Sequence, residues 1–260
     1  MRIVFIGAER VGLACLKKLI DLHREPVGVF TADDSLKPQI ADFVPFDPVV
    51  LSFGIPLFKI QDSKDPDFIR QVQELKPDLI LIISWSQIIP QEVVRTPALG
   101  CVGIHYSLLP TRRGGAPLFW AIWDGLKESG ISLFYLNGGV DTGDLIAQKK
   151  FSITPEDTAK TLLDKIEHLA PELLTEQIDA IVQGKAPRVA QDERMRSVTK
   201  RRTPEEGEIP SKISLEELDR FIRALAPPYP GAFTWAGDHK LVFSSSRWKE
   251  GKLWVEGYLQ

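Results

Sequence analysis

The chain has 260 residues, 43% of them apolar, with a formal net charge of −3 and a pI of about 5.9. This length and composition suit one large α/β domain with a small appendage. The mildly acidic balance argues against a large RNA-binding surface, because proteins dedicated to nucleic acids are more often basic. No stretch approaches the ~18 consecutive apolar residues that indicate a membrane span. We therefore expect a cytoplasmic protein with no signal peptide and no membrane contact.

Apolar periodicity predicts an alternation of strands and helices in the first half of the chain. Short apolar runs that end at turn residues indicate buried strands at 3–6, 27–30, 78–83 and 102–105. Helix-like spacing of apolar residues is found at 10–23, 46–53 and 67–75. A β-α-β order that repeats in this way predicts the α/β class, with a doubly wound, mostly parallel sheet.

The second half adds a helix at 116–124 and strands at 131–136 and 145–151. Thr154 followed by Pro155 and two acids is typical of a helix start, and this helix is expected to run to about Gln183. The composition changes after Ala186, and the charged, Pro- and Gly-containing stretch that follows is typical of a linker.

A small α+β appendage is predicted beyond the linker. Ser214 and Glu217 form a capping-box pattern for a helix at 214–224. Three short strands are expected after it, at 231–236, 240–246 and 252–258. The predicted domains are therefore residues 1–186 for catalysis, 187–210 as a linker and 211–260 as a small C-terminal domain.

Two loop segments carry the strongest functional signal. His105 lies within Gly103–Pro110, directly after a predicted strand, and Asp141 follows it by 141 − 105 = 36 residues. Open α/β sheets place such residues at the carboxyl ends of their strands, where they bind ligands. An imidazole and a carboxylate brought together there can act as an acid/base pair.

Residues 100–145 resemble the formyltransferases that use N10-formyltetrahydrofolate. This family acts on methionyl-tRNA, on glycinamide ribonucleotide and on nucleotide-linked amino sugars. Its pattern is Asn-x-His-x-Ser-Leu-Leu-Pro with an Asp 36 residues after the His, and the present chain keeps all of this except the Asn. The resemblance implies a Rossmann-like formyltransferase fold and N10-formyltetrahydrofolate as the formyl donor, without a metal. It also implies that His105 relays the proton of the attacking amine and that Asp141 orients the imidazole.

Gly103 stands where the family has its catalytic Asn. Loss of a side-chain amide from an oxyanion site typically costs about 10²–10³ in rate. A backbone N–H, a water molecule in the vacated space or the side chain of Asn137 could compensate. A folate-binding homologue with lost or weak catalysis is the alternative. We expect an active enzyme, because the rest of the motif is intact.

The resemblance also implies which loops bind the two substrates. The folate-site residues are expected to be Ser86, Gln87, Ile88 and Ile89, with Val140, Asp141, Thr142 and Gly143 opposite. The acceptor-site residues are expected to be Glu9, Arg10, Tyr106, Ser107, Arg112 and Arg113. The two arginines open a Gly-rich loop before a helix, which favours phosphate or carboxylate binding, although a purely structural turn explains them equally well.

Two other enzyme classes fit less well. Residues 7–12 imitate a dinucleotide fingerprint, but Glu9 replaces its second Gly and would block a pyrophosphate. A serine hydrolase is disfavoured because Ser107 lies two residues from His105 and no Gly-x-Ser-x-Gly occurs. No spacing of His, Cys or Asp indicates a metal site.

The C-terminal part indicates the acceptor. Residues 201–207 and 222–233 resemble the linker and domain opening of methionyl-tRNA formyltransferases and of amino-sugar nucleotide formyltransferases. About fifty residues follow the linker, which is too few for the complete barrel of the tRNA enzymes. We therefore expect a nucleotide-linked amino sugar, with methionyl-tRNA as the alternative. A homodimer that pairs the C-terminal strands is left open.

Overall fold

The computed structural model describes residues 1–260. Seven strands form the central sheet: β1 (Ile3–Ile6), β2 (Gly28–Ala32), β3 (Leu57–Ile60), β4 (Leu79–Ile82), β5 (Cys101–His105), β7 (Glu128–Tyr135) and β8 (Leu145–Ser152). Their order is β3-β2-β1-β4-β5-β7-β8; β7 runs antiparallel to both β5 and β8, and all other neighbouring strands are parallel. The predicted doubly wound, mostly parallel α/β fold is thus confirmed.

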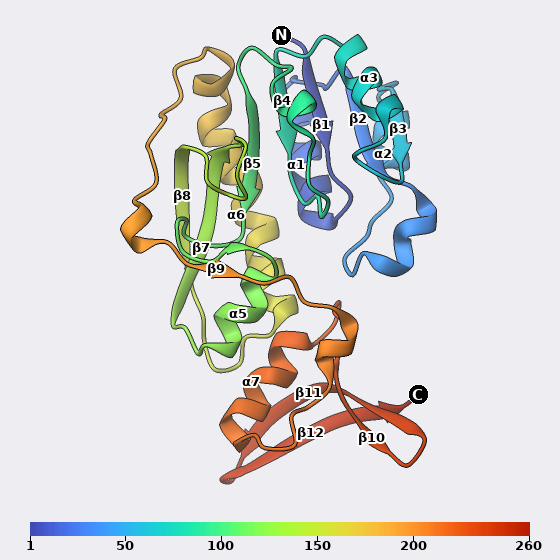
Figure 1. The fold of residues 1–260 in the computed structure, drawn as a ribbon, viewed down its shortest axis with the longest axis vertical. Coiled ribbons are helices and arrows are strands. Elements are labelled where there is room, and N and C mark those ends of the chain that lie inside the picture. The colour runs from blue at the N-terminus through green and yellow to red at the C-terminus, as the bar shows by residue number, and fades with distance from the viewer.

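Helices cover both faces of this sheet, as Figure 1 shows. They are α1 (Arg10–Asp21), α2 (Asp47–Ser52), α3 (Pro66–Glu74), α4 (Gln91–Val94), α5 (Pro117–Trp123) and α6 (Ala159–Val182). The larger core cluster, with 39 buried residues, joins α1, α5 and α6 to one face, while a cluster of 11 joins α3 and α4 to the other. No helix is both long enough and apolar enough to span a bilayer.

The C-terminal unit lies beyond the carboxyl ends of the parallel strands (Figure 1). It consists of α7 (Leu215–Leu225) and an antiparallel sheet of β10 (Ala232–Ala236), β11 (His239–Lys249) and β12 (Lys252–Leu259). The helix packs on α5 through an aromatic cluster in which Phe221 meets Phe119 and Trp123 edge to face. The predicted small α+β appendage and its Ser214 cap are confirmed, and the structure shows that its strands are antiparallel.

The segment between α6 and α7 is more ordered than a linker pattern predicts. It contains two short 3₁₀ turns, Glu193–Met195 and Pro204–Gly207, and the strand β9 (Val198–Thr199), which pairs with β6 (Arg113–Gly114). The pairing ties this segment to the loop that follows β5. Neither strand is visible in the sequence pattern, because two-residue strands have no periodicity.

The predicted start of α6 at Thr154 is wrong. The helix begins at Ala159, and Thr158 is its N-cap. The Asp157 carboxylate instead accepts hydrogen bonds from the Thr154 amide and from the hydroxyl of Thr161, which closes a turn before the helix. Thr158 and Thr161 then form a reciprocal capping box.

A buried ion pair fastens the C-terminal unit to the main domain. Arg223 Nε lies 2.9 Å from the Asp219 carboxylate, and its Nη1 donates to the Asp157 carbonyl at 2.8 Å. Ser246 of β11 donates to the same Asp219 carboxylate. Asp219 therefore links α7 to the C-terminal sheet, and Arg223 links α7 to the turn before α6.

We predict that Asp219→Ala lowers the free energy of unfolding by about 3–5 kcal/mol, because it leaves the Arg223 charge buried and unpaired. Chemical denaturation measures this loss. Replacement of both partners by Leu and Met is the matched control and should recover most of the stability. A single variant as stable as the wild type would contradict the assigned role of the pair.

Candidate active site

His105 is the last residue of β5, and its ring is buried, with 8% of the residue exposed. Its Nε2 lies 2.7 Å from the carbonyl oxygen of Arg112, and its Nδ1 lies 3.5 Å from Oδ2 of Asp141. Because a carbonyl can only accept, Nε2 carries a proton. The Nδ1 atom then faces the carboxylate, so that a second proton can be held between His105 and Asp141.

Asp141 is held in a backbone conformation that few non-glycine residues adopt, with φ of +52°. Its Oδ2 accepts a hydrogen bond from the Gly114 amide at 2.8 Å. The side-chain amide of Gln191 donates to the carbonyls of Asp141 at 2.9 Å and of Gly143 at 2.7 Å. These contacts hold the carboxylate against the imidazole.

Gln191 is a site residue that the sequence analysis missed. It comes from the segment after α6, which the composition marks only as a linker. Arg113 donates through Nε and Nη2 to the side-chain oxygen Oε1 of Gln191 and pairs with Glu193 at 2.6 Å. We infer that Arg113 positions Gln191, which in turn positions Asp141.

Two predicted acceptor-site residues, Arg112 and Arg113, instead form ion pairs with acids of the protein itself. Arg113 is 3% exposed and is not available to a phosphate, so we withdraw it from the acceptor site. Arg112 pairs with Asp124 at 2.7 Å, and its amide donates to Ser197 Oγ. The structural-turn interpretation of this loop fits better than the phosphate-binding one.

Ser107 shapes the loop after β5. It is 1% exposed, and its hydroxyl donates to the Thr111 carbonyl at 2.6 Å. Its own carbonyl accepts from Ser132, whose hydroxyl also accepts from the Leu109 amide. The structure thus favours a loop-shaping role over the predicted substrate contact.

The space beside Gly103 is filled by Leu136. A Cβ atom added at Gly103 would lie 2.9 Å from Cδ1 of Leu136 and 3.1 Å from the Ile82 carbonyl oxygen. The vacated volume is therefore occupied by an apolar methyl group, which disfavours the expected water molecule. Glycine at 103 and leucine at 136 are packed as a pair.

Asn137 does not compensate for the missing amide in this conformation. It is exposed, and its Oδ1 accepts from the Gly139 amide at 2.9 Å and from the Thr142 hydroxyl at 2.7 Å. These bonds stabilise the loop that carries Asp141. Of the three expected compensations, a backbone N–H remains.

The two loops expected to bind folate are joined. Gln91 donates from Nε2 to the Asn137 carbonyl at 3.3 Å, which bridges the segment after β4 to the Asp141 loop. Ile88 is 75% exposed and Val140 is 58% exposed, so each loop presents one apolar side chain to solvent. In contrast, Gln87 bonds to Ser63 and Gln61, and Ile89 is buried in the core.

Glu9 and Arg10, the predicted acceptor residues after β1, have different surroundings. Arg10 pairs with Asp42 at 3.0 Å, Asp164 at 2.6 Å and Glu167 at 3.2 Å. It therefore connects α1 to α6, and we withdraw it from the acceptor site. Glu9 has no such partner and stays a candidate.

Tyr106, the last of the predicted acceptor residues, follows His105 and is partly buried. Its hydroxyl forms a hydrogen bond with Ser84, in the loop after β4. It lies with Glu9 at the carboxyl edge of the sheet.

We predict that Gly103→Asn alone lowers the melting temperature by several degrees, because its Cβ collides with Leu136. Leu136→Ala in the same chain should remove the collision, so the double variant should be more stable than the sum of the two single changes. A thermal double-mutant cycle measures this coupling. Additive effects would show that the two positions do not share the space.

Residues 1–178 match the family model for formyl transferases. The methionyl-tRNA formyltransferase of Clostridioides difficile is 33% identical over 240 residues, which cover 92% of this chain and 77% of that relative.

Two solved structures are similar over nearly their whole length. Methionyl-tRNA formyltransferase from Clostridium thermocellum has a TM-score of 0.75 and 24% identity, covering 100% of this chain and 99% of that one. WlaRD, a sugar 3N-formyl transferase solved in the presence of dTDP and 5-N-formyl-THF, has a TM-score of 0.71 and 18% identity, covering 99% and 97%. With the His105–Asp141 pair on the matching fold, the chain belongs to the formyl transferase family and is a formyltransferase.

Proposed function

We propose that this formyltransferase moves a formyl group from N10-formyltetrahydrofolate to the primary amine of a nucleotide-linked amino sugar. The observation that carries the formyl-transfer step of this proposal is the contact of Nδ1 of His105 with Asp141, at the carboxyl end of β5. A buried imidazole whose other nitrogen is fixed by a carbonyl can take up and return a proton only on the side of this carboxylate.

This geometry suits amine formylation. A bond forms between the amine nitrogen and the formyl carbon, and the nitrogen must lose a proton as it does so. The His105–Asp141 pair can hold that proton and return it to the nitrogen of the donor as the old bond to the formyl carbon breaks. For an amine that attacks in its neutral form, one proton is moved and none is consumed, which matches the single proton that the His105–Asp141 pair can hold. An acceptor that arrives as an ammonium ion first releases one further proton to the solvent.

The loops at 86–89 and 140–143 suit a folate. Pterin is a flat ring with an apolar face and a polar edge. The exposed Ile88 and Val140 can cover such a face. WlaRD, which was solved in the presence of 5-N-formyl-THF, has a similar fold.

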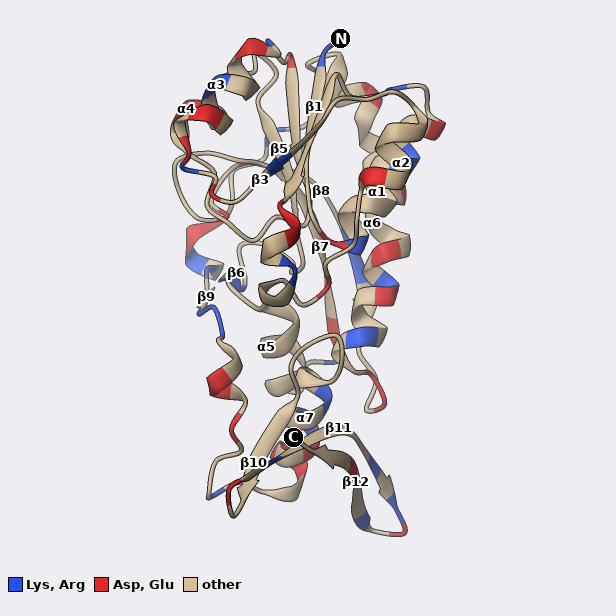
Figure 2. Cartoon of the chain, turned by 90° about the vertical axis from the view of Figure 1, so that its right-hand side faces the viewer, with Lys and Arg blue, Asp and Glu red and all other residues tan.

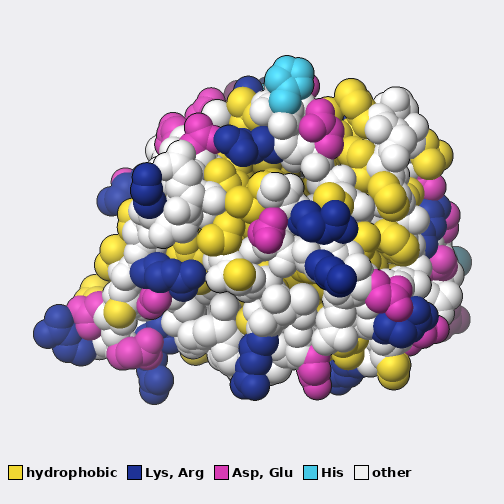
Figure 3. Space-filling model, turned by 90° about the horizontal axis from the view of Figure 1, so that it is seen from above, with side chains coloured by type: hydrophobic (Ala, Val, Ile, Leu, Met, Phe, Trp, Pro, Cys, Tyr) yellow, Lys and Arg dark blue, Asp and Glu magenta, His cyan; other side chains and the backbone are white.

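Charge and fold support a small acceptor. Positive and negative side chains are interspersed on the face that Figure 3 shows, and Figure 2 shows the same mixture along α6. The formal net charge of −3 likewise gives no overall excess of basic residues for an RNA-binding surface. We also propose a division of the chain into domains. Residues 1–186 form the catalytic domain, residues 187–210 connect it to the C-terminal unit, and residues 211–260 form a small second domain.

Methionyl-tRNA is the second candidate acceptor, because the 33% identical relative from Clostridioides difficile carries that activity in its name. The two candidates differ greatly in size and charge. A direct assay can therefore separate them.

We predict that the protein, incubated with N10-formyltetrahydrofolate, converts one member of a pool of amino-sugar nucleotides to a product that is heavier by one formyl group. Mass spectrometry of a reaction that also contains methionyl-tRNA reads both acceptors at once. Formylation of methionyl-tRNA alone would overturn the sugar assignment. Folate binding without any product would favour the homologue that lost catalysis with the amide at position 103.

We predict that His105→Ala reduces formyl transfer by at least about 10²-fold, because the proton carrier is lost. Folate affinity, measured by fluorescence titration, should be unchanged. Substitution of the exposed His239 by Ala is the matched control and should leave both quantities as they are. Full activity in the His105 variant would contradict the proposed mechanism.

A further inference from the structure

The sheet reverses its winding direction between β1 and β4. From β1 the chain continues to β2 and β3 on one side, and β4 and β5 then lie on the other. In doubly wound sheets the loops after two such strands diverge and leave a crevice for ligands. Glu9 follows β1 and Ser84 follows β4, and the Ala8 amide joins the loops by donating to the Ser84 carbonyl at 3.1 Å. Glu9 therefore lies at the ligand-binding crevice of the fold.

The carboxyl group of Glu9 has no partner within the protein. It occupies the N-cap position of α1 but accepts no hydrogen bond from the helix. The adjacent Arg10 is committed to three other acids, and none of the ion pairs of the structure includes Glu9. A half-buried carboxyl group that helps neither the helix nor an ion pair costs stability, which points to a role toward a ligand.

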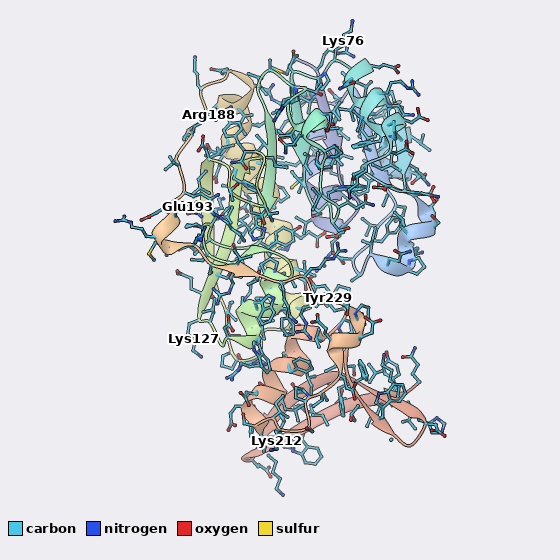
Figure 4. All side chains as sticks on the ribbon, in the orientation of Figure 1. Lys76, Lys127, Arg188, Glu193, Lys212 and Tyr229 are labelled. Atoms are coloured by element: carbon cyan, nitrogen blue, oxygen red, sulfur yellow. The ribbon has the colours of Figure 1, made fainter.

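Groups from four other segments surround Glu9. Asp42 comes from the connection after β2, Arg201 from the segment after β9, Tyr106 from the end of β5 and Tyr229 from the turn after α7. Figure 4 shows Tyr229 where this turn approaches the main domain. Arg201 also donates to the Ser86 carbonyl at 3.2 Å, so its charge is shared with the loop after β4.

The charges around Glu9 are unbalanced toward the negative. Burial and the nearby Asp42 raise the pKa of Glu9 to about 7, and Arg201 opposes this rise. Burial and Glu9 raise the pKa of both Tyr106 and Tyr229, which therefore remain protonated hydroxyl groups. The crevice thus holds two neutral hydroxyls beside one carboxyl group that is short of positive charge.

We propose that Glu9 determines acceptor specificity by binding the amine-bearing end of the acceptor as an ammonium ion, with the hydroxyls of Tyr106 and Tyr229 beside it. The inference rests on the proposed function in one respect, that the acceptor is a primary amine. Such amines are protonated at neutral pH. An unpaired carboxylate in a partly desolvated crevice gains a charge-assisted bond from an ammonium group that a hydroxyl group cannot supply.

The sign of the pH dependence follows from this pairing. Glu9 attracts an ammonium ion only when it is deprotonated, so amine affinity should rise as the pH increases through about 7. Asp42 and Arg201 act in opposite directions on this midpoint. Affinity should fall again once the pH exceeds the pKa of the amine itself. A ligand with a hydroxyl group in place of the amine should show neither change.

The test compares amine ligands with their hydroxyl analogues by calorimetry on the full chain, without folate. The two pairs are a dTDP-linked amino sugar with the matching dTDP-sugar, and methionine amide with its α-hydroxy analogue. At about pH 7.5, which is above the pKa of Glu9 and below the ~7.7–8.0 of an α-amino group, the wild type should prefer one amine about tenfold or more, which is the effect of one charge-assisted hydrogen bond. Glu9→Gln should remove this preference and its pH dependence.

Two controls separate this role from a structural one. Glu9→Gln should keep the folate affinity of the wild type and keep or raise its melting temperature, because an unpaired carboxyl group is removed. Glu25→Gln, at an exposed acid in the loop after α1, should keep the amine preference. If only methionine amide shows the Glu9-dependent preference, the inference holds and the sugar assignment fails. If the wild type prefers neither amine, or if Glu9→Gln retains the preference, the inference is overturned.

Discussion

The site depends on the left-handed backbone at Asp141, which turns the carboxylate toward Nδ1 of His105. A non-glycine residue in that region is strained by about 1 kcal/mol or more and keeps its conformation only if its surroundings enforce it. Here the Gly114 amide holds the carboxylate and the side-chain amide of Gln191 holds the Asp141 and Gly143 carbonyls. Removal of these bonds would leave the imidazole with its carbonyl partner alone.

The segment after α6 is therefore in contact with the proposed active site and is not a passive connection. It supplies Gln191, pairs with the loop after β5 through β9, and places Arg201 against the loop after β4. The same chain then leads to α7, where Arg223 reaches back to the Asp157 carbonyl. Hydrogen bonds from this segment and from α7 therefore link the C-terminal unit to the part of the main domain that contains the site, although the two are distant in sequence.

The fold and the His105–Asp141 pair could be predicted from the sequence because both produce recognisable patterns among residues that are close in sequence. Buried parallel strands are short apolar runs, and His105 and Asp141 lie in a motif of fixed spacing. The partners of Arg10 and Arg113 could not be predicted. Arg10 and Arg113 look like ligand-binding residues in sequence, but they pair with acids that lie 32 or more residues away. Gln191 was missed for the same reason, since its partners are backbone carbonyls, which have no sequence signature.

The consequence of Gly103 depends both on the family resemblance and on the packing around this residue. In sequence it is a missing amide, whereas in the structure its space belongs to Leu136, and Asn137 is held by its own loop. A side-chain amide is thus absent at this position, and the proposed mechanism relies on a backbone N–H as the oxyanion donor and on the proton held between His105 and Asp141.

The most direct test of this account is nitrogen NMR of the histidine rings with and without tetrahydrofolate. The chain has four histidines, so the signals can be assigned by single substitutions. The account predicts a proton on Nε2 of His105 in the free protein and a change at Nδ1 when folate occupies the adjacent loops. A His105 ring that is unprotonated at Nε2, or that is unaffected by bound folate, would contradict the proposed active site.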